Sequence, residues 1–171
     1  MPVLTGCVMP VLELMEAAAL LPARGALIGL DLGTKTIGVA ASDPDRRVAA
    51  PVETIARKRL SLDAQRISTL ATERRAVGYV LGLPVNMDGT EGPRAQATRA
   101  FARNFARLTE LPIALWDERL STAAVERALI AADASRTKRK AVIDQHAASY
   151  ILQGALDRLA KHNLPQARDD R

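Results

Sequence analysis

The sequence predicts one α/β domain in which a mixed five-stranded sheet is flanked by helices. Three apolar runs follow one another with only short turns between them, and two later apolar runs alternate with segments of helical periodicity. The last part of the chain is helical in pattern throughout. With 171 residues, of which 48% are hydrophobic and 25% charged, the chain can bury a real core, which argues against a disordered or fibrous protein.

The first three strands are expected to be antiparallel. Residues 26–30 form an apolar run that ends at Asp31, and a turn over residues 33–35 leads to a second run over residues 37–41, a pattern typical of a β-hairpin. Residues 52–56 are β-branched and alternate in polarity, and only a turn and a short loop precede them. They add a third strand.

Helices and strands then alternate. Ser61 can cap a helix, and residues 77–83 are typical of a buried strand. Pro93 fits the first turn of the next helix, and residues 112–116 return to strand. We expect the apolar faces of these two helices to consist of Ala64, Ile67, Leu70 and Ala71 and of Ala97, Phe101, Phe105 and Leu108.

Two further helices complete the domain. Ser121 or Thr122 would cap the first, and the second covers about residues 141–159. The chain order is therefore three strands, then helix, strand, helix, strand and two helices. This order is that of the RNase H-like fold.

We assign residues 26–162 to this domain. Residues 1–25 form an N-terminal extension with a docking helix over about residues 11–21, and residues 163–171 form a polar tail. The extension lacks the basic N-terminal region of a signal peptide, and its apolar stretch is too short to span a membrane. Cys7 is the one cysteine of the sequence, so no intrachain disulfide can form. We therefore expect a cytoplasmic protein.

The charge of the chain points to a polyanionic partner. The formal net charge is +5, and the 24 basic residues are 19 Arg and 5 Lys. A guanidinium can hold two phosphate oxygens at once, although Arg-rich composition alone is weak evidence. Arg136, Lys138, Arg139 and Lys140 precede the last helix and are expected to bind a nucleic-acid backbone, whereas the stripe Arg99, Arg103, Arg107 is interpreted as a solvated helix face.

Asp31 is the first candidate for chemistry. It closes a buried strand with Gly29 and Gly33 on either side, and the glycines leave room for a phosphate beside the carboxylate. An aspartate at an ordinary hairpin turn is the alternative. The segment also resembles the first phosphate loop of actin-like ATPases and sugar kinases, but that architecture needs two such domains, which 171 residues cannot hold.

Glu118 is the second candidate. Asp117 and Glu118 follow the strand that we place beside the first one, and consecutive residues of a strand point to opposite faces. Only one of them can aim at the site of Asp31. We choose Glu118, with Asp117 left to cap or pair, while the alternative is a helix N-terminus that favours acidic residues.

Asp144 is the third candidate. It opens a largely apolar helix whose small residues allow close packing on a sheet, so its carboxylate would be held rigidly. A buried carboxylate is costly unless something compensates it, and a metal ion is one means. His146 lies two positions further on and would project away, which favours a packing or surface role.

Residues 82–92 form the fourth motif. A strand that runs into a loop with glycines, an amide and hydroxyls before a helix suits phosphate contacts. An ordinary loop is equally compatible, because Asp88 would repel a phosphate. We expect Asn86, Lys35 and Arg119 to contact the substrate.

Together the motifs resemble the YqgF family of pre-16S rRNA nucleases and Holliday junction resolvase-like proteins. The resemblance covers residues 26–153 and rests on GLDLGTKTIGVAASD, GLPVNMDGTEG, DERLST and DQHAASYILQ in this order. It implies an RNase H-like fold, metal-dependent phosphodiester cleavage and a part in maturing the 5′ end of 16S rRNA. His146 departs from the family, in which a small or aliphatic residue is usual.

The family's acidic residues correspond by position to Asp31, Glu118 and Asp144, the same three that the motifs suggest. The implied mechanism is phosphodiester hydrolysis that depends on one or two Mg²⁺ or Mn²⁺ ions. If two ions bind, they are roughly 4 Å apart. Hard cations prefer such oxygen ligands. Asp31 would bridge the ions, with Glu118 and Asp144 on either side.

The expected partner is RNA, either pre-16S rRNA or the small-subunit precursor. Branched DNA is an alternative substrate, and a metal-independent RNA-binding module is the alternative to an enzyme, because ancestry does not prove activity. We expect no membrane partner and a monomer or homodimer.

Overall fold

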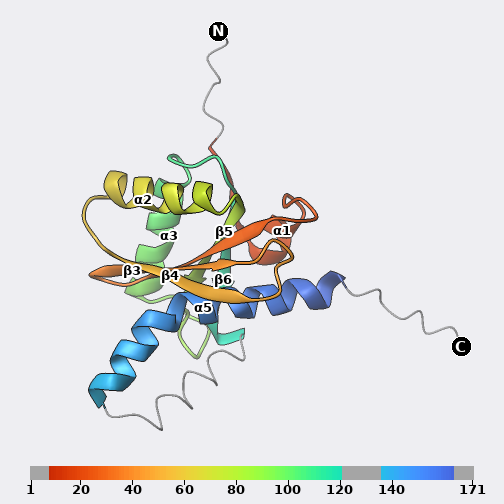
Figure 1. Cartoon of the computed structure of the whole chain (residues 1–171). Coiled ribbons are helices and arrows are strands. Elements are labelled where there is room, and N and C mark those ends of the chain that lie inside the picture. Colours follow the sequence, from red (N-terminus) through yellow and green to blue (C-terminus); the bar gives the residue numbers. More distant parts are fainter. Residues whose placement is uncertain (1–7, 121–135, 164–171) are drawn as a thin grey trace, which may run out of the picture.

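The computed structural model describes residues 8–120 and 136–163, with the backbone alone over residues 136–145. One sheet lies between layers of helices (Figure 1). The elements in chain order are β1 (Val11–Glu13), α1 (Leu14–Ala18), β2 (Ala26–Leu32), β3 (Thr36–Ser42), β4 (Ala49–Ala56), α2 (Leu60–Glu73), β5 (Ala76–Leu83), α3 (Pro93–Phe105), β6 (Ile113–Asp117), the 3-10 turn η1 (Glu118–Leu120) and α5 (Arg136–Asn163).

The sheet is mixed, as predicted, but it has six strands in the described residues rather than five, in the order β1-β6-β5-β2-β3-β4. The strands β1, β6, β5 and β2 are mutually parallel, and β3 is antiparallel to both of its neighbours. The carboxyl ends of β2, β5 and β6 therefore meet at one edge. Ligands of open α/β sheets bind at this kind of edge.

The sixth strand corrects the prediction of one helix over residues 11–21. Val11–Glu13 is instead a strand that pairs with β6, with Val11 opposite Ile113, and α1 has only five residues. Without β1 the outer side of β6 would be an unpaired edge, so backbone pairing outweighs the helical periodicity here. Leu14 and Ala17 of α1 are buried.

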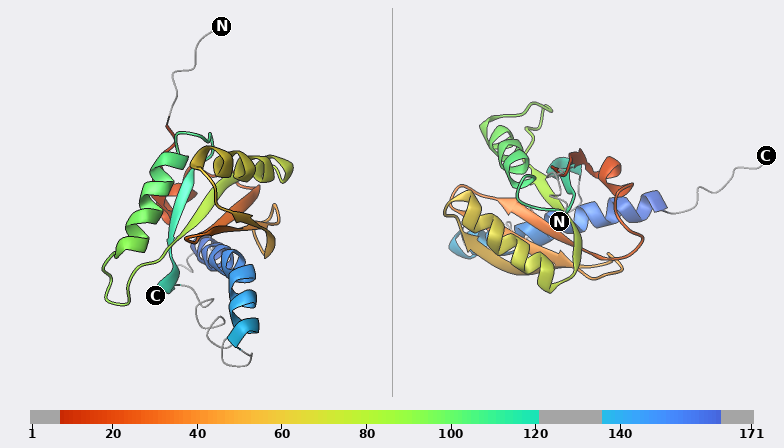
Figure 2. Two further views of the ribbon diagram at one scale, coloured as in Figure 1. Left: turned by 90° about the vertical axis from the view of Figure 1, so that its left-hand side faces the viewer. Right: turned by 90° about the horizontal axis from the view of Figure 1, so that it is seen from above.

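Each face of the sheet has its own apolar core. Helices α2 and α3 cover one face, and α5 with α1 covers the other (Figure 2). The alternation along β2 separates the two cores: Leu30 belongs to the first and Leu27 to the second. No helix in the described part of the chain is long and apolar enough to cross a bilayer.

Two details of the predicted helices are wrong. Ser61 lies inside α2 rather than at its cap, and the buried Asp63 carboxylate instead accepts the Lys58 N–H at 3.1 Å. Ala97 of α3 is exposed, and Leu108 is exposed and lies beyond the end of α3, so neither belongs to the buried face of that helix. That face consists of Ala95, Thr98, Phe101, Ala102 and Phe105.

The last helix begins at Arg136 and ends at Asn163, so it is longer at both ends than the predicted range 141–159. The cationic segment that was expected to precede this helix forms its first turns. The helix predicted after Ser121 or Thr122 and the polar tail lie outside the described residues.

The helix α5 approaches the sheet closely because three glycines lie beneath it. A Cβ atom at Gly29 would lie 2.7 Å from Leu152 Cβ and 3.0 Å from the Ala148 carbonyl oxygen. At Gly38 it would lie 3.4 Å from Ala148 Cβ, and at Gly82 only 2.5 Å from Ile151 Cδ1. Such contacts mark a place where another backbone packs directly on a strand.

We predict that Gly29→Ala lowers the free energy of unfolding by about 1–3 kcal/mol, because the new methyl group must push the backbone of α5 away from β2. Gly38→Ala is the matched control on the same interface. Its methyl group meets only ordinary van der Waals contact and should leave stability within about 1 kcal/mol of wild type. Urea unfolding of both variants measures the difference, and equal stabilities would contradict the close-packing argument.

Candidate active site

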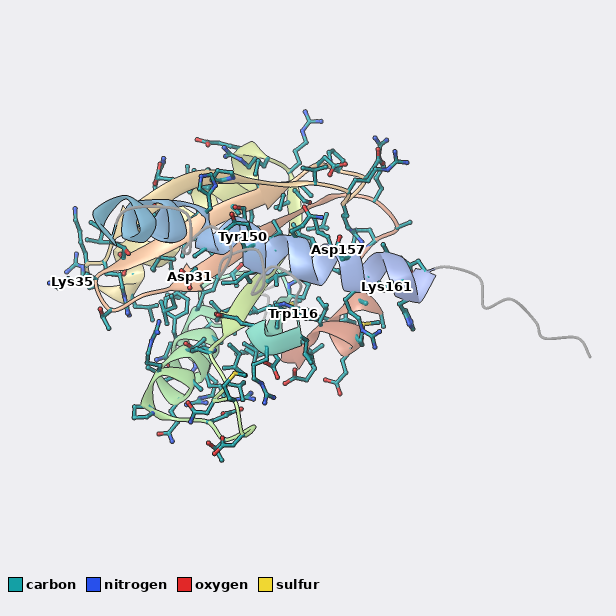
Figure 3. All side chains as sticks on the ribbon, turned by 90° about the horizontal axis from the view of Figure 1, so that it is seen from below. Asp31, Lys35, Trp116, Tyr150, Asp157 and Lys161 are labelled. Carbon is teal, nitrogen blue, oxygen red and sulfur yellow. The ribbon has the colours of Figure 1, made fainter. Side chains whose placement is uncertain are left out.

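Asp31 lies at the carboxyl-end edge of the sheet, on the face that α5 covers. It is the penultimate residue of β2 and is half-buried. It pairs with Gly38 of β3, and a Cβ at Gly38 would lie 3.5 Å from Asp31 Cβ and 3.4 Å from Ala148 Cβ of α5. The Asp31 side chain therefore leaves the sheet beneath α5 (Figure 3).

Glu118 reaches the same face from β6. Its Oε1 atom lies 2.7 Å from the position that a Cβ at Gly82 would take, where Ile151 of α5 also lies. The strand β5 separates β6 from β2, and neighbouring strands are about 4.8 Å apart, so the Asp31 and Glu118 backbones are roughly 10 Å apart across Gly82. Because Gly82 has no side chain, Ile151 and the Glu118 carboxylate can occupy the space above it.

Asp117 points away from this site. Its carboxylate accepts three hydrogen bonds from the Arg119 side chain, two from Nε at 3.1 and 3.2 Å and one from Nη2 at 2.7 Å, together with the Arg119 backbone N–H at 3.0 Å. These hydrogen bonds from Arg119 hold the pKa of Asp117 below its usual value. The two adjacent acids therefore occupy different environments, as strand alternation requires.

Arg119 also fastens the loop that follows β5. Its Nη1 donates to the Asn86 carbonyl at 3.1 Å and to the Met87 carbonyl at 3.4 Å. Together with the bonds to Asp117, these contacts form what we call the Arg119 clamp. The clamp ties the residues on both sides of Glu118 to the loop over residues 84–92.

The loop itself is internally bonded. The Asn86 N–H donates to the Thr90 carbonyl at 2.9 Å, and the Asn86 amide nitrogen donates to Thr90 Oγ1 at 3.0 Å. The Asp88 carboxylate accepts the Thr90 hydroxyl and N–H, and the hydroxyl is the main cause of the lowered pKa of Asp88. These hydrogen bonds stabilise the ionised form of Asp88, so the repulsion expected between Asp88 and a phosphate remains.

A cavity of about 460 Å³ adjoins Glu118 on the side of this loop. Its walls come from the loop, the start of α3 and the residues after β6. The lining residues are Pro84, Val85, Asn86, Met87, Gly92, Pro93, Arg94, Glu118 and Arg119.

The other predicted site residues lie at the same edge or outside the described side chains. Lys35 is exposed in the turn between β2 and β3, close to Asp31 (Figure 3). Asp144 is helical in α5, but its side chain lies outside the described part, as do those of Arg136, Lys138, Arg139 and Lys140. His146 is half-buried, with its ring 6.3 Å from that of Tyr150.

The described residues supply two of the three predicted metal ligands. Among them, no group of three His, Cys, Asp or Glu side chains could hold a metal ion. Asp31 and Glu118 offer carboxylate oxygens, which suit hard cations such as Mg²⁺ or Mn²⁺. The donor chemistry therefore fits the predicted ion, with the third ligand expected from Asp144.

Comparison with known proteins now assigns the chain to a family. Residues 25–158 match the family model described as "RuvX: Holliday junction resolvase". The chain belongs to the RuvX family. The resemblance to this family that the four motifs indicated is confirmed.

RuvX relatives from two bacteria cover most of the chain. A Rhodopseudomonas palustris (strain BisB5) protein is 73% identical over 154 residues, which are 90% of this chain and 96% of the relative. A Bradyrhizobium sp. (strain BTAi1) protein is 70% identical over 151 residues, which are 88% of this chain and 94% of the relative. Both carry the name "Putative pre-16S rRNA nuclease".

The predicted RNase H-like fold is confirmed by solved structures. Thermus thermophilus RuvC in complex with a Holliday junction substrate superposes with a TM-score of 0.52 and 10% sequence identity, covering 81% of this chain and 95% of RuvC. A second structure of the same RuvC gives a TM-score of 0.50 at 12% identity, over 80% and 95% of the two chains. At these identities the likeness concerns the fold alone.

Sequence reasoning missed two parts of this RuvX site. It placed Gly82 in the buried strand over residues 77–83 but gave this glycine no part in the site, whereas it lies between the strands that carry the two carboxylates. It also took Arg119 only as a substrate contact, whereas the guanidinium bonds to Asp117 and to two loop carbonyls. The spacing of Asp117 and Arg119 around Glu118 was a usable signal, because residues two apart on a strand share a face.

We predict that Arg119→Met loosens the loop over residues 84–92. Loss of the charge-assisted bonds should raise the hydrogen-exchange rates of the Asn86 and Gly89 amides roughly threefold to tenfold at pH 7. Arg66→Met, which removes another bidentate partner of a carboxylate, is the control and should leave these amides unchanged. Equal exchange in both variants would contradict the clamp.

The same loop should loosen in acid. The folded-state pKa of Asp117 is lowered, so its ionised form stabilises the folded state above the ordinary aspartate value of about 3.9, and this stabilisation is lost as the pH falls through the lowered folded value.

Proposed function

We propose that the chain is a cytoplasmic metal-dependent endonuclease that hydrolyses phosphodiester bonds and processes the 5′ end of pre-16S rRNA. The observation that carries the proposal is the placement of Asp31 and Glu118 beneath α5 on either side of Gly82. Membership of the RuvX family and the names of the relatives support it.

Asp31, Glu118 and Asp144 would hold one or two Mg²⁺ or Mn²⁺ ions. When bound, such ions activate a water and stabilise the leaving oxygen of the phosphodiester. The chain itself contributes fixed positions: Gly82 leaves room for the Glu118 carboxylate to lie over the sheet, and the Arg119 clamp holds the backbone around Glu118. Lys35 and Asn86 lie at the same edge, where a substrate backbone would pass.

A second candidate function is resolution of branched DNA. The description of the family and the Holliday junction bound to RuvC favour this reading. Incubation of the protein with labelled precursor RNA and with a labelled four-way junction, with and without Mn²⁺, distinguishes the substrates. Gel retardation of RNA without cleavage at any metal concentration would instead indicate a binding module.

We predict that Asp31→Asn and Asp144→Asn each abolish cleavage and leave the fold intact, because removal of a ligand charge affects metal binding more than packing. Asp157→Asn is the matched control, since Asp157 is exposed and its carboxylate accepts a hydrogen bond from the Gln153 side chain at 3.0 Å. Asp31→Asn and Asp144→Asn should keep the circular dichroism spectrum of wild type and lose cleavage, whereas Asp157→Asn should keep both. Cleavage within a few-fold of wild type in Asp31→Asn would remove the site assignment.

We also predict that Glu118→Gln damages cleavage far more than Asp117→Asn. Asp117 acts through Arg119, and loss of such an outer partner reduces activity by about 10–100-fold, whereas loss of a ligand charge should bring the rate to the detection limit. Single-turnover cleavage at saturating Mn²⁺ provides the ranking. The reverse ranking would exchange the roles of the two acids.

A further inference from the structure

Two short segments bring four cations together beside Asp31. Lys35 lies in the turn between β2 and β3, and Arg57, Lys58 and Arg59 connect β4 to α2. The Arg57 N–H donates to the Lys35 carbonyl at 2.9 Å, and Arg57 Nη1 donates to the Gly33 carbonyl at 2.7 Å. We call these four residues the turn cluster.

The turn cluster is exposed, and no carboxylate of the described residues neutralises its charges, as is also the case for Arg94 and Arg103. Other arginines form ion pairs, namely Arg24, Arg66, Arg74, Arg99 and Arg119. Within the described residues, none of the four cluster side chains has an ion pair with a carboxylate.

The Arg57 guanidinium supports the turn through the Gly33 carbonyl, but no side-chain contact within the described residues gives the charges of Lys35, Lys58 and Arg59 a stabilising role. Thr36 and Ala56 are the last opposite pair of β3 and β4, and Lys35 and Arg57 are the next pair beyond them. Like charges that face each other across neighbouring strands destabilise a sheet. The buried Asp63 carboxylate lies next to the cluster in α2. It accepts a hydrogen bond from the Lys58 backbone N–H and not from a cluster side chain.

The position of the cluster relates it to the candidate active site. β4 is two strands from β2, and Arg57 lies three residues beyond Thr54, the β4 residue level with Asp31, so the Arg57 backbone is roughly 14 Å from that of Asp31, on the side away from Glu118 and the loop over residues 84–92. Figure 3 shows Lys35 beyond Asp31 at the outer tip of this end of the sheet, with Lys161 at the opposite end of the molecule.

We propose that the turn cluster binds backbone phosphates of the nucleic acid on the flank of the active site opposite to Glu118, at nucleotides other than the one that is cleaved. This inference rests on the proposed nuclease function. Arg and Lys side chains that contact phosphates fix the register of a nucleic acid without reading its sequence. The cluster thus sets where along the strand the scissile bond lies.

The test compares two triple variants with the same loss of charge. Lys35→Ala/Lys58→Ala/Arg59→Ala removes three cluster cations and keeps Arg57, whose guanidinium supports the turn. The control, Arg47→Ala/Arg158→Ala/Lys161→Ala, removes three exposed cations from the far end of the molecule. The probe is a labelled single-stranded RNA with the precursor sequence around the 16S 5′ end, titrated in EDTA at several salt concentrations.

We expect the cluster variant to bind more weakly for every RNA sequence and to flatten the slope of log K against log salt by about 0.7 for each lost phosphate contact. With metal, KM should rise and kcat should stay unchanged. The control should match wild type, and the thermal midpoint of the cluster variant should be equal or higher, because like charges are removed. A slope equal to that of wild type, or the same change in the control, would overturn the inference.

Shortened RNAs locate the contact. Removal of nucleotides from one side of the cleaved bond should abolish the difference between wild type and the cluster variant, while removal from the other side should preserve it; a difference that persists at every length would contradict a local contact. If the wild type cleaves RNA but the cluster variant has the salt slope of wild type, the turn cluster is rejected as a binding surface and the nuclease function is retained. A changed slope without cleavage under any metal would reject the nuclease function and retain the cluster as a binding surface.

Discussion

The close approach of α5 to the sheet is the constraint on which the site depends. It is possible because Gly29, Gly38 and Gly82 present no side chain to the helix, so its small residues pack directly on the strands. Asp31 and Glu118 leave the sheet into the same layer, beneath a helix that also carries Asp144. The spacing of helix and sheet therefore fixes the depth at which the carboxylates lie, and a larger residue at Gly82 would compete with Glu118 for space.

Charges around the site are divided between two tasks. Arg119 is bonded to Asp117 and to the carbonyls of the neighbouring loop, so it stabilises the protein around Glu118. The cations of the turn cluster have no such carboxylate partners within the described residues and remain available to a polyanion. An arginine count alone does not separate these roles, because guanidinium groups suit both carboxylates and phosphates.

Membership of the RuvX family and the RNase H-like fold explain why the parts occur together. The parallel strands β2, β5 and β6 end at one edge, where their following loops converge. Asp31 lies at the end of β2, and the loop over residues 84–92 and Glu118 follow β5 and β6. A fold of this kind hosts more than one chemistry, so the specific function is argued from the carboxylates and the surrounding cations rather than from the architecture.

The sequence by itself determined the order of the elements from β2 to β6 and the opposite faces of Asp117 and Glu118, because period-two alternation and apolar runs are local properties. Tertiary structure decided the rest. Residues 11–13 became a strand because β6 offered a partner, and Asp63 rather than Ser61 supports the start of α2 because it is buried against that segment. The role of Gly82 and the meeting of Lys35 with Arg57 depend on which strands are neighbours, and pairing between distant segments leaves no local trace in the sequence.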